Sequence, residues 1–381
     1  MKNKMNKTIL IMAAGTGGHI FPGLAIAHQF RDNDFNVVWL GTKHGMENQI
    51  VPAHQFPIET IAMKGLRNNG LLRLLMLPVQ LLKAMYQVFK IIKRLKPDLT
   101  IGMGGYVSAP GGLMSWITRT PLLIHEQNSR AGLSNKLLNL LAQKTLCAFP
   151  KVTEEFYRKT TIKLTGNPVR EDIIAIDRQT NANDKNTLNI LVLGGSLGAQ
   201  QLNTIVPQAI DKFIQSSNIY QQVNVKHQTG KNKSIDSANN KTLNINYQYI
   251  EFIDDMAEAY LWANIAICRA GALTISEIAI SQLPAIFVPY PYAVDDHQTT
   301  NAKYLVDNDA AYLINDRTLS ADGLIDVLNE LTPNRLNTMQ ENLKSLAKPN
   351  ATNEIYEQCL KLMNIQPAAL KNETNEVNHH A

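Results

Sequence analysis

The first stretch with a clear secondary-structure pattern is Lys7-Thr-Ile-Leu-Ile-Met-Ala-Ala-Gly-Thr-Gly-Gly-His19-Ile-Phe-Pro-Gly-Leu-Ala-Ile-Ala27. The apolar run ends at Ala14, a glycine-rich turn follows, and Pro22 is expected to open a helix, where its missing N–H costs little. Glycines let the backbone approach a ligand closely, and a helix N-terminus adds partial positive charge. The stretch therefore predicts a strand, an anion-binding turn and a helix, which together start an α/β fold.

This turn differs from the dinucleotide-binding fingerprint in two ways. Ile20 stands where the third glycine is required, and the expected strand 36–42 ends without the acidic residue that would hold a ribose. The sequence therefore disfavours a nicotinamide-dependent enzyme.

His19 is the one side chain in the turn that can transfer a proton near neutral pH. One interpretation makes it the general base beside a bound substrate, and the other makes it a histidine that shapes the loop by hydrogen bonding. Residue type alone divides these about evenly, and the glycine-rich setting favours the functional interpretation modestly.

Composition limits the class of protein. The 381 residues suggest two or three domains, and a hydrophobic content of 45% gives each of them a core. With 37 basic against 32 acidic residues the net charge is +5, so the position of the charge matters more than its total. Cys147, Cys268 and Cys359 form no pair or zinc-ligand spacing, which is typical of a reduced cytosolic protein.

Neither a secretory signal nor a membrane span is expected. The apolar run after Thr8 is short and meets Gly15 where a signal would have a cleavage site. No stretch reaches the ~18 apolar residues that a spanning helix needs.

Strand and helix patterns alternate in both halves, and the opening strand, glycine-rich turn and helix return at Leu188–Leu202. This order predicts two doubly wound parallel-sheet domains facing a central cleft, because open parallel sheets bind ligands beyond the carboxyl ends of their strands. We expect an N-terminal domain at 1–176, a polar linker at 177–187 and a C-terminal domain at 188–350. A C-terminal helix at 351–366 and a disordered tail at 367–381 are expected to follow.

Two further clusters of the first half carry possible chemistry. A second glycine-rich turn, Gly102–Gly112, suits a second phosphate group or is a tight packing turn. His125-Glu-Gln-Asn128 follows an apolar run, where it forms a ligand edge or a simple strand-ending turn.

Two clusters of the second half suit a nucleotide sugar. In Cys268–Glu277 the backbone and Thr274 suit a diphosphate. Glu277 suits the hydroxyls of a ribose or caps a helix, and residue type alone favours the cap. The polar loop Asp295–Asn301 is expected to begin a helix. It either binds sugar hydroxyls or only caps that helix. Asp254-Asp255 and Asp295-Asp296 each precede a helical pattern, so we expect capping carboxylates and no metal site.

The stretch from Lys64 to Lys96 is basic and apolar, with eight basic residues and no acidic one. A helical region over 71–96, broken by Pro78, suits the surface of an anionic membrane, although part of its apolar face must pack on the sheet. The alternative is an ordinary core helix with a solvated basic face. Nucleic acid is disfavoured because aromatic residues are scarce and leucines abundant.

Seven motifs occur in the order seen in the MurG family of bacterial N-acetylglucosaminyltransferases, and the likeness covers nearly the whole chain. They are Gly15–Gly23, Gly104–Pro110, His125–Asn128, Gly166–Arg170, Gly194–Ala199, Arg269–Glu277 and Asp296–Gln298.

This resemblance implies a B-type glycosyltransferase that moves N-acetylglucosamine from UDP-N-acetylglucosamine to the C4 hydroxyl of undecaprenyl-pyrophosphoryl-N-acetylmuramyl-pentapeptide, turning lipid I into lipid II. It implies inversion of the anomeric centre, no metal or other cofactor, a peripheral position on the cytoplasmic face of the inner membrane, and possible partners among cell-wall synthesis proteins. By motif, the donor residues are Thr16, Gly17, Gly18, Asn128, Arg170, Ser196, Ile253, Ala272, Leu273, Thr274, Glu277 and Gln298. The acceptor residues are Gly104, Gly105 and Tyr106.

Two rival functions stay open at this point. A UDP-N-acetylglucosamine epimerase shares this type of fold but needs no lipid acceptor, and a non-catalytic sensor at the membrane would only bind the nucleotide sugar. Sugar transfer to a lipid-linked acceptor separates all three.

Overall fold

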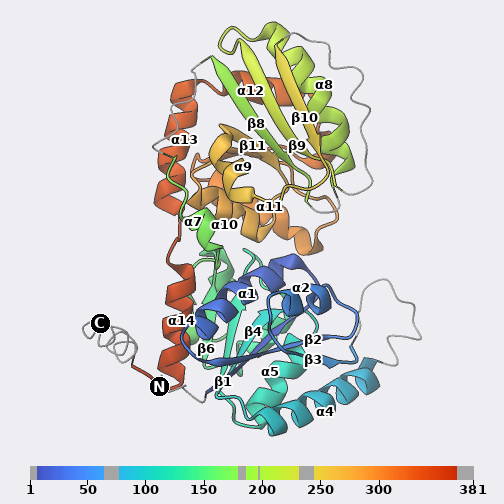
Figure 1. The fold of residues 1–381 in the computed structure, drawn as a ribbon, viewed down its shortest axis with the longest axis vertical. Coiled ribbons are helices and arrows are strands. Elements are labelled where there is room, and N and C mark those ends of the chain that lie inside the picture. The colour runs from blue at the N-terminus through green and yellow to red at the C-terminus, as the bar shows by residue number, and fades with distance from the viewer. Residues whose placement is uncertain (1–6, 64–76, 179–185, 196–197, 231–243, 367–381) are drawn as a thin grey trace, which may run out of the picture. The chain divides into compact units, whose positions relative to one another are not determined.

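The computed structural model describes residues 7–63, 77–178, 186–195, 198–230 and 244–366. Backbone contacts divide the chain into two compact units (Figure 1). Unit 1 holds the residues up to Pro168 and those from Asn350 onward, and unit 2 holds Val169–Pro349.

Unit 1 is an α/β unit built on one parallel sheet. Its strands are β1 (Thr8–Ala13), β2 (Asn36–Thr42), β3 (Ile58–Ile61), β4 (Leu99–Gly104), β5 (Leu122–Glu126), β6 (Lys144–Cys147) and β7 (Ile162–Leu164). Its α-helices are α1 (Gly17–Asp32), α2 (Glu47–Ala53), α4 (Leu77–Leu95), α5 (Ser108–Ile117), α6 (Leu133–Leu138) and α14 (Ala351–Leu362), and short 3-10 turns cover Lys151–Glu155 and Lys159–Thr161.

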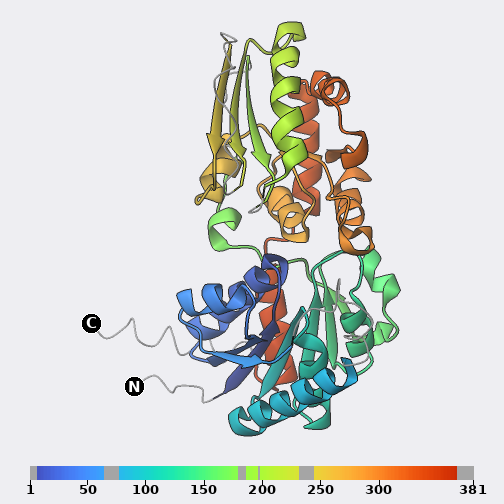
Figure 2. The same ribbon diagram turned by 90° about the vertical axis from the view of Figure 1, so that its right-hand side faces the viewer.

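The seven strands of unit 1 lie in the order β3-β2-β1-β4-β5-β6-β7, all parallel where paired. Side chains of β1 alternate between the two faces, so Ile9 and Ile11 face α1 and α14, whereas Leu10 and Met12 face α4 and α5. Figure 2 shows α14 and α4 on the two sides of this sheet. Both faces are therefore covered, which confirms the doubly wound prediction.

The opening turn differs from the prediction in where its helix begins. Helix α1 starts at Gly17 with Thr16 as its N-cap residue, and the amides of His19 and Ile20 both donate to the Thr16 carbonyl. Pro22 lies inside the helix, so the expectation that it opens the helix is wrong. Gly17 and Gly18 of the glycine-rich turn are therefore the first two residues of the helix.

Helix α4 differs in a similar way. Pro78 is its second residue and so stands in the first turn, where proline fits, and it does not break the described helix. Residues 64–76 of the expected basic stretch lie outside the described residues. Among the described residues no helix has the length and apolar character needed to cross a bilayer.

Unit 2 repeats the α/β pattern on a six-stranded parallel sheet. Its strands are β8 (Thr187–Leu193), β9 (Gln222–Gln228), β10 (Ile245–Ile250), β11 (Ile265–Cys268), β12 (Ala285–Phe287) and β13 (Ala311–Leu313), in the order β10-β9-β8-β11-β12-β13. Its α-helices are α7 (Glu171–Ile174), α8 (Gln200–Ser216), α9 (Met256–Trp262), α10 (Ala272–Ile280), α11 (His297–Val306), α12 (Ala321–Glu330) and α13 (Pro333–Leu346), and 3-10 turns cover Val294–Asp296 and Asp316–Thr318. Helices α8, α12 and α13 pack on one face of this sheet.

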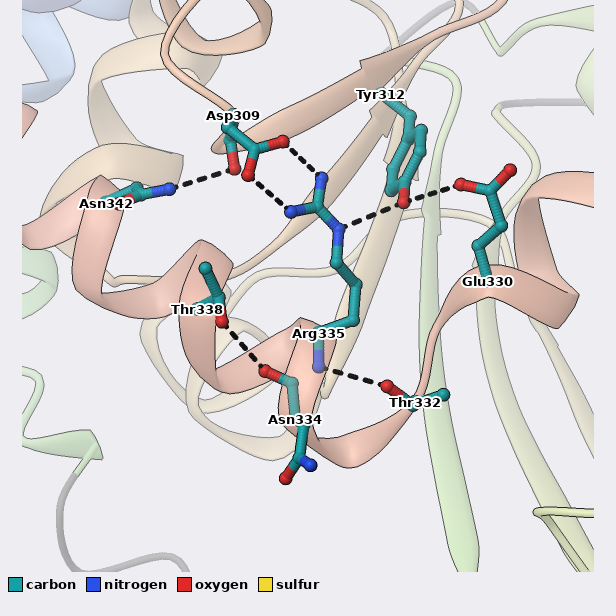
Figure 3. A network of polar contacts seen from close by, with 8 residues as sticks. All are labelled: Asp309, Tyr312, Glu330, Thr332, Asn334, Arg335, Thr338 and Asn342. Carbon is teal, nitrogen blue, oxygen red and sulfur yellow. Dashed lines mark hydrogen bonds and ion pairs between the residues drawn. The ribbon is translucent and has the colours of Figure 1, made fainter.

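Helix α13 is pinned to the sheet edge by a polar network around Arg335 (Figure 3). Its guanidinium makes two hydrogen bonds to Asp309, of 2.6 and 2.7 Å, and its Nε donates to the Tyr312 hydroxyl on β13 at 3.0 Å. The hydrogen bonds from Arg335 hold the pKa of the Asp309 carboxyl below its usual range. The N-cap Thr332 accepts from the Arg335 amide, so one residue joins helix start and sheet edge.

The division into units differs from the expected domain boundaries. The first unit ends at Pro168, and α14 belongs to unit 1, where Tyr356 packs edge-on against Phe30 with ring centroids 4.9 Å apart. Arg178, expected in the linker, donates to the carbonyls of Tyr260, Ala263 and Ser281 in unit 2. These carbonyls lie at the C-terminal ends of helices α9 and α10, so the start of the polar segment is bound to unit 2. Residues 179–185 lie outside the described residues, as does the tail 367–381.

Candidate functional site

In unit 1 the two glycine-rich turns meet at the switch point of the sheet. Strand β1 pairs with both β2 and β4, so the chain changes direction there, and both turns follow the carboxyl ends of β1 and β4. A Cβ on Gly105 (φ 81°) would lie 2.1 Å from the Ala14 carbonyl oxygen, so only glycine allows the two turns to pack.

Gly104 brings the backbone against the ring of His19. Its φ is 115°, and a Cβ there would lie 2.5 Å from His19 Nδ1. On another side His19 Nδ1 lies 3.1 Å from Gln127 Oε1, at the end of β5. The structure therefore brings together His19, the second glycine-rich turn and the His125–Asn128 motif, which the sequence placed separately.

A buried carboxylate supports the first turn from the β2 side. Glu47 is fully buried, and its Oε1 accepts from the amide and hydroxyl of Thr42 at 2.8 and 2.7 Å. Its Oε2 accepts from the Gly15 amide at 3.2 Å. Sequence reasoning missed Glu47, because nothing in its local pattern separates it from the other first-turn acids.

The remaining expected residues of unit 1 surround the same turns. Thr16 is exposed, and Gly17 and Gly18 form the first turn of α1 beside it. Tyr106 is 38% exposed at the second turn. The amide and side chain of Asn128 both donate to Glu126 Oε1, at 3.0 and 3.3 Å, so Glu126 fixes the loop after β5.

Unit 2 contains a cavity of about 840 Å³ at its own switch point, between the ends of β8 and β11. Four of the expected donor residues line it, namely Ile253, Thr274, Glu277 and Gln298. Three others, Arg170, Ala272 and Leu273, are not among its lining residues, and Ser196 lies outside the described residues. Gly271, the N-cap residue of α10, also lines the cavity, so the positive end of that helix faces it.

Glu277 lies in the second turn of α10, and its Oε2 accepts from the Tyr260 hydroxyl of α9 at 2.8 Å. The helix-capping interpretation of Glu277 is therefore wrong, because the first turn of α10 contains no acidic residue. Burial raises the pKa of Glu277 above its ordinary value, and the Tyr260 hydrogen bond and the charge of Arg170 oppose that rise.

Of the two acidic pairs of unit 2, one caps a helix as expected. Asp255 is the N-cap residue of α9 and accepts from the Glu258 amide at 2.8 Å. Asp296 is the N-cap residue of α11, but its side chain makes no capping hydrogen bond; its Oδ1 accepts from the Thr299 hydroxyl at 2.7 Å. In the described ranges no group of three or more His, Cys, Asp or Glu side chains could hold a metal ion.

Several lining residues were not foreseen as site residues. Tyr260 comes from a helix without a recognisable motif, and only its contact with Glu277 reveals it. Arg269 and the buried Asp316 form an ion pair at 2.5 Å, and the side chains of Phe252, Tyr290 and Tyr292 are exposed along the cavity.

Both halves of the chain match family models. Residues 9–147 match the glycosyltransferase family 28 N-terminal domain, and residues 189–361 match the C-terminal domain of the same family. A protein of Paraburkholderia phymatum named UDP-N-acetylglucosamine--N-acetylmuramyl-(pentapeptide) pyrophosphoryl-undecaprenol N-acetylglucosamine transferase is 45% identical over 376 residues, covering 97% of this chain and 98% of that protein. The chain belongs to the MurG family of N-acetylglucosaminyltransferases.

Solved structures agree with membership of the MurG family. The crystal structure of Acinetobacter baumannii MurG is 36% identical, with a TM-score of 0.78, and the match covers 93% of this chain and 99% of that one. A UDP-GlcNAc 2-epimerase from Neisseria meningitidis, solved with UDP-GlcNAc bound, reaches a TM-score of 0.60 at 14% identity over 93% of this chain and 100% of that one. That second likeness shows the shared B-type glycosyltransferase fold alone.

Proposed function

We propose that this protein transfers N-acetylglucosamine from UDP-N-acetylglucosamine to the C4 hydroxyl of undecaprenyl-pyrophosphoryl-N-acetylmuramyl-pentapeptide, with inversion at the anomeric carbon. The observation that carries the proposal is the 45% identity over 376 residues to a protein named for this transfer. The paired switch-point sites of the two units support it, because one suits a nucleotide and the other holds a candidate base.

The donor is assigned to the cavity of unit 2. The diphosphate lies at the N-terminus of α10, where Gly271 leaves the backbone accessible and Thr274 offers a hydroxyl. Glu277 accepts hydrogen bonds from the ribose hydroxyls through Oε1, because Tyr260 contacts its other oxygen atom, Oε2.

The acceptor is assigned to the glycine-rich turns of unit 1. Its hydroxyl oxygen forms a bond to the anomeric carbon while the bond from that carbon to the diphosphate oxygen breaks. The hydroxyl proton passes to His19, and UDP leaves with the electron pair of the broken bond. His19 later returns the proton to solvent.

A membrane surface is assigned to helix α4. Its inner face buries Ala84, Val88 and Ile92, yet the side chains of Val79, Leu82 and Tyr86 are 64%, 64% and 59% exposed. These three are spaced by three and four residues, so they form one solvent-facing stripe. The exposed Lys83 and Lys90 accompany the stripe, and Lys90 Nζ lies 4.7 Å from the centre of the Tyr86 ring. This arrangement suits an anionic lipid surface.

Transfer of label tests the function directly. The full chain is incubated with UDP-N-acetylglucosamine labelled in the sugar and with a short-chain lipid-linked acceptor, and the lipid product is separated and counted. We expect label in the lipid product only when the acceptor is present. Epimerised sugar nucleotide without an acceptor would instead support the epimerase, and tight binding without any product would support the sensor.

A further inference from the structure

Three side chains of unit 1 form a continuous chain of polar contacts that ends on the backbone. His19 Nδ1 lies 3.1 Å from Gln127 Oε1, and Gln127 Nε2 lies 3.0 Å from His125 Nδ1. His125 Nε2 in turn lies 2.9 Å from the carbonyl oxygen of Gly166. His125 is fully buried and Gln127 is 1% exposed, so water does not compete for these groups.

The orientation of the Gln127 amide follows from a backbone carbonyl. Its Nε2 also donates to the main-chain oxygen of His125 at 3.2 Å. A carbonyl oxygen only accepts hydrogen bonds, so the NH₂ end of the amide must face His125 and the oxygen must face His19.

The tautomer of His125 follows in the same way. Its Nε2 faces the Gly166 carbonyl and must carry a proton, while its Nδ1 faces the NH₂ group of Gln127 and must be bare. Burial lowers the pKa of His125 to about 4, which agrees with a neutral ring holding one proton.

We propose that Gln127, itself oriented by His125 and Gly166, is a positioning residue that fixes the tautomer of His19. The Gln127 oxygen can only accept, so His19 Nδ1 carries the proton and Nε2 presents its lone pair. This inference rests on the proposed role of His19 as general base, since a bare Nε2 is the form that takes a proton. After proton transfer, the Nδ1–H bond to Gln127 still supports the charged ring.

Gly104 restricts the same ring from a second direction. A side chain at that position would meet His19 Nδ1, Cε1 and Cγ, all within 3.1 Å of its Cβ. The ring therefore lies against bare backbone, and a flip that exchanged its nitrogen and carbon atoms would lose the bond to Gln127. The two contacts fix both the plane of the ring and the nitrogen that holds the proton.

Gln127→Met tests this role, because it keeps the length of the side chain but removes both the acceptor and the donor. The full chain labelled with ¹⁵N-histidine is examined by long-range ¹H–¹⁵N correlation, which distinguishes protonated from bare ring nitrogens. Signals of His19 and His125 are identified by their loss in His19→Ala and His125→Phe. The matched control is Gln143→Met, because Gln143 Oε1 accepts from the Leu122 amide at the opposite end of β5.

We expect opposite tautomers in the unaltered protein, with the proton on Nδ1 of His19 and on Nε2 of His125. Gln127→Met should abolish the preference at His19 and lower kcat by roughly 10- to 100-fold, within the range of general-base catalysis, with UDP affinity unchanged. Gln143→Met should leave both readouts as they are.

Two results would overturn the inference, and neither is the failure of the proposed function. A proton on Nε2 of His19 in the unaltered protein, or full kcat in a folded Gln127→Met variant while His19→Ala is inactive, would remove the role of Gln127. Full activity of His19→Ala would instead refute the base and leave the tautomer assignment standing.

Discussion

Glu277 is the residue whose role changes most once its surroundings are known. It lies in the second turn of α10, lines the cavity, and is bound on one oxygen atom by Tyr260. A carboxylate held in this way keeps its other oxygen atom for a ligand.

Replacing Glu277 by Ala should therefore weaken UDP binding by roughly 1.5–3 kcal/mol, the range for hydrogen bonds to a charged group. Calorimetric titration with UDP measures the change. Tyr260→Phe is the matched control, because it removes the hydroxyl contact and keeps the carboxylate, so it should cost less affinity. Unchanged affinity in a folded Glu277→Ala protein would mean that the ribose is bound elsewhere.

His19→Ala should lower kcat by about 10²–10⁴-fold, because the acceptor hydroxyl would lose its base. The affinity for UDP should stay largely intact, since the proposed nucleotide cavity is lined by residues of unit 2. Steady-state kinetics combined with UDP titration separates the two effects. An equal loss of UDP binding, or unfolding, would show that His19 is a structural residue of the turn.

Gly104→Ala should reduce activity strongly, because a methyl group there would displace the His19 ring. The left-handed backbone at Gly104 adds a strain of about 1–3 kcal/mol in an alanine variant. Gly195→Ala isolates the strain, because Gly195 has φ 80° and none of the described atoms lies within 4 Å of the position that its Cβ would take. Thermal unfolding of both variants measures the backbone strain. The kcat of Gly104→Ala then reports the displacement of the His19 ring. Normal activity in Gly104→Ala would show that the ring has room to move.

The sequence predicted the residues that belong to motifs but not the ones that support them. His19 and Glu277 stand in recognisable strand–turn–helix patterns, so their chemistry and approximate place followed from local order. Gln127 stood inside a quoted motif, yet its contact with His19 joins residues 108 positions apart. Tyr260 acts from another helix, and no local pattern reports such a pairing.

At the scale of elements, helix α4 has one face that packs on the sheet and another that is exposed. Its inner face holds the sheet, so the exposed stripe of Val79, Leu82 and Tyr86 is left for another surface. The expectation that part of the apolar face packs on the sheet is confirmed, and the exposed stripe on the opposite face is the part that we propose for the membrane surface.

Charge reversal on α4 should weaken attachment to anionic vesicles. Lys83→Glu combined with Lys90→Glu is expected to reduce sedimentation with acidic vesicles at low salt, since each surface basic residue contributes about 1 kcal/mol and is screened by salt. The control is Lys212→Glu on α8 of unit 2, which should sediment like the unaltered protein. Equal sedimentation with neutral and acidic vesicles at low salt would refute the electrostatic part of the proposal.

The bounds of a strand were predictable where its apolar run is long. The strands at the edges of the sheets were not predictable in this way. Strand β2 begins and ends where the pattern indicated, because its residues are mostly buried. Strand β10 alternates Ile, Asn, Tyr, Gln, Tyr and Ile at the sheet edge, and β13 has three residues, so both give weak signals. Prolines misled the helix starts, because Pro22 is tolerated inside α1.

At the scale of the whole molecule, each unit keeps one neutral histidine fully buried. Burial lowers the pKa of His125 in unit 1 and of His227 in unit 2 to about 4. In the unfolded chain both rings have the ordinary pKa of about 6.5. Between these values the unfolded chain binds protons that the folded units do not.

The free energy of unfolding should therefore fall as the pH drops from about 6.5 toward 4, by at most about 3 kcal/mol for each histidine. His227→Gln should flatten this dependence for unit 2. Thermal unfolding from pH 8 to pH 5 measures the effect, and pH 8, where both rings are neutral in either state, is the reference. An unchanged slope in the variant would contradict the assignment.

The repeated strand, turn and helix at residues 8 and 188 predicted two similar units, because each half can bury its own sheet. The segment boundaries were harder to predict, since α14 carries an amphipathic pattern that fits either unit. Burial of α14 side chains in the core of unit 1, including the contact of Tyr356 with Phe30 more than 300 positions earlier in the chain, places α14 there.

That placement of α14 has a consequence for the order in which a ribosome delivers the parts. Unit 1 is interrupted by the whole of unit 2, and the apolar face formed by Phe30 and Phe35 waits for Tyr356 and its neighbours. During synthesis the N-terminal segment therefore emerges first but completes its core last, whereas unit 2 is encoded without interruption and has all its strands before α14 appears. A released chain that ends at Pro349 should thus contain a protease-resistant second unit and a first unit with one uncovered face.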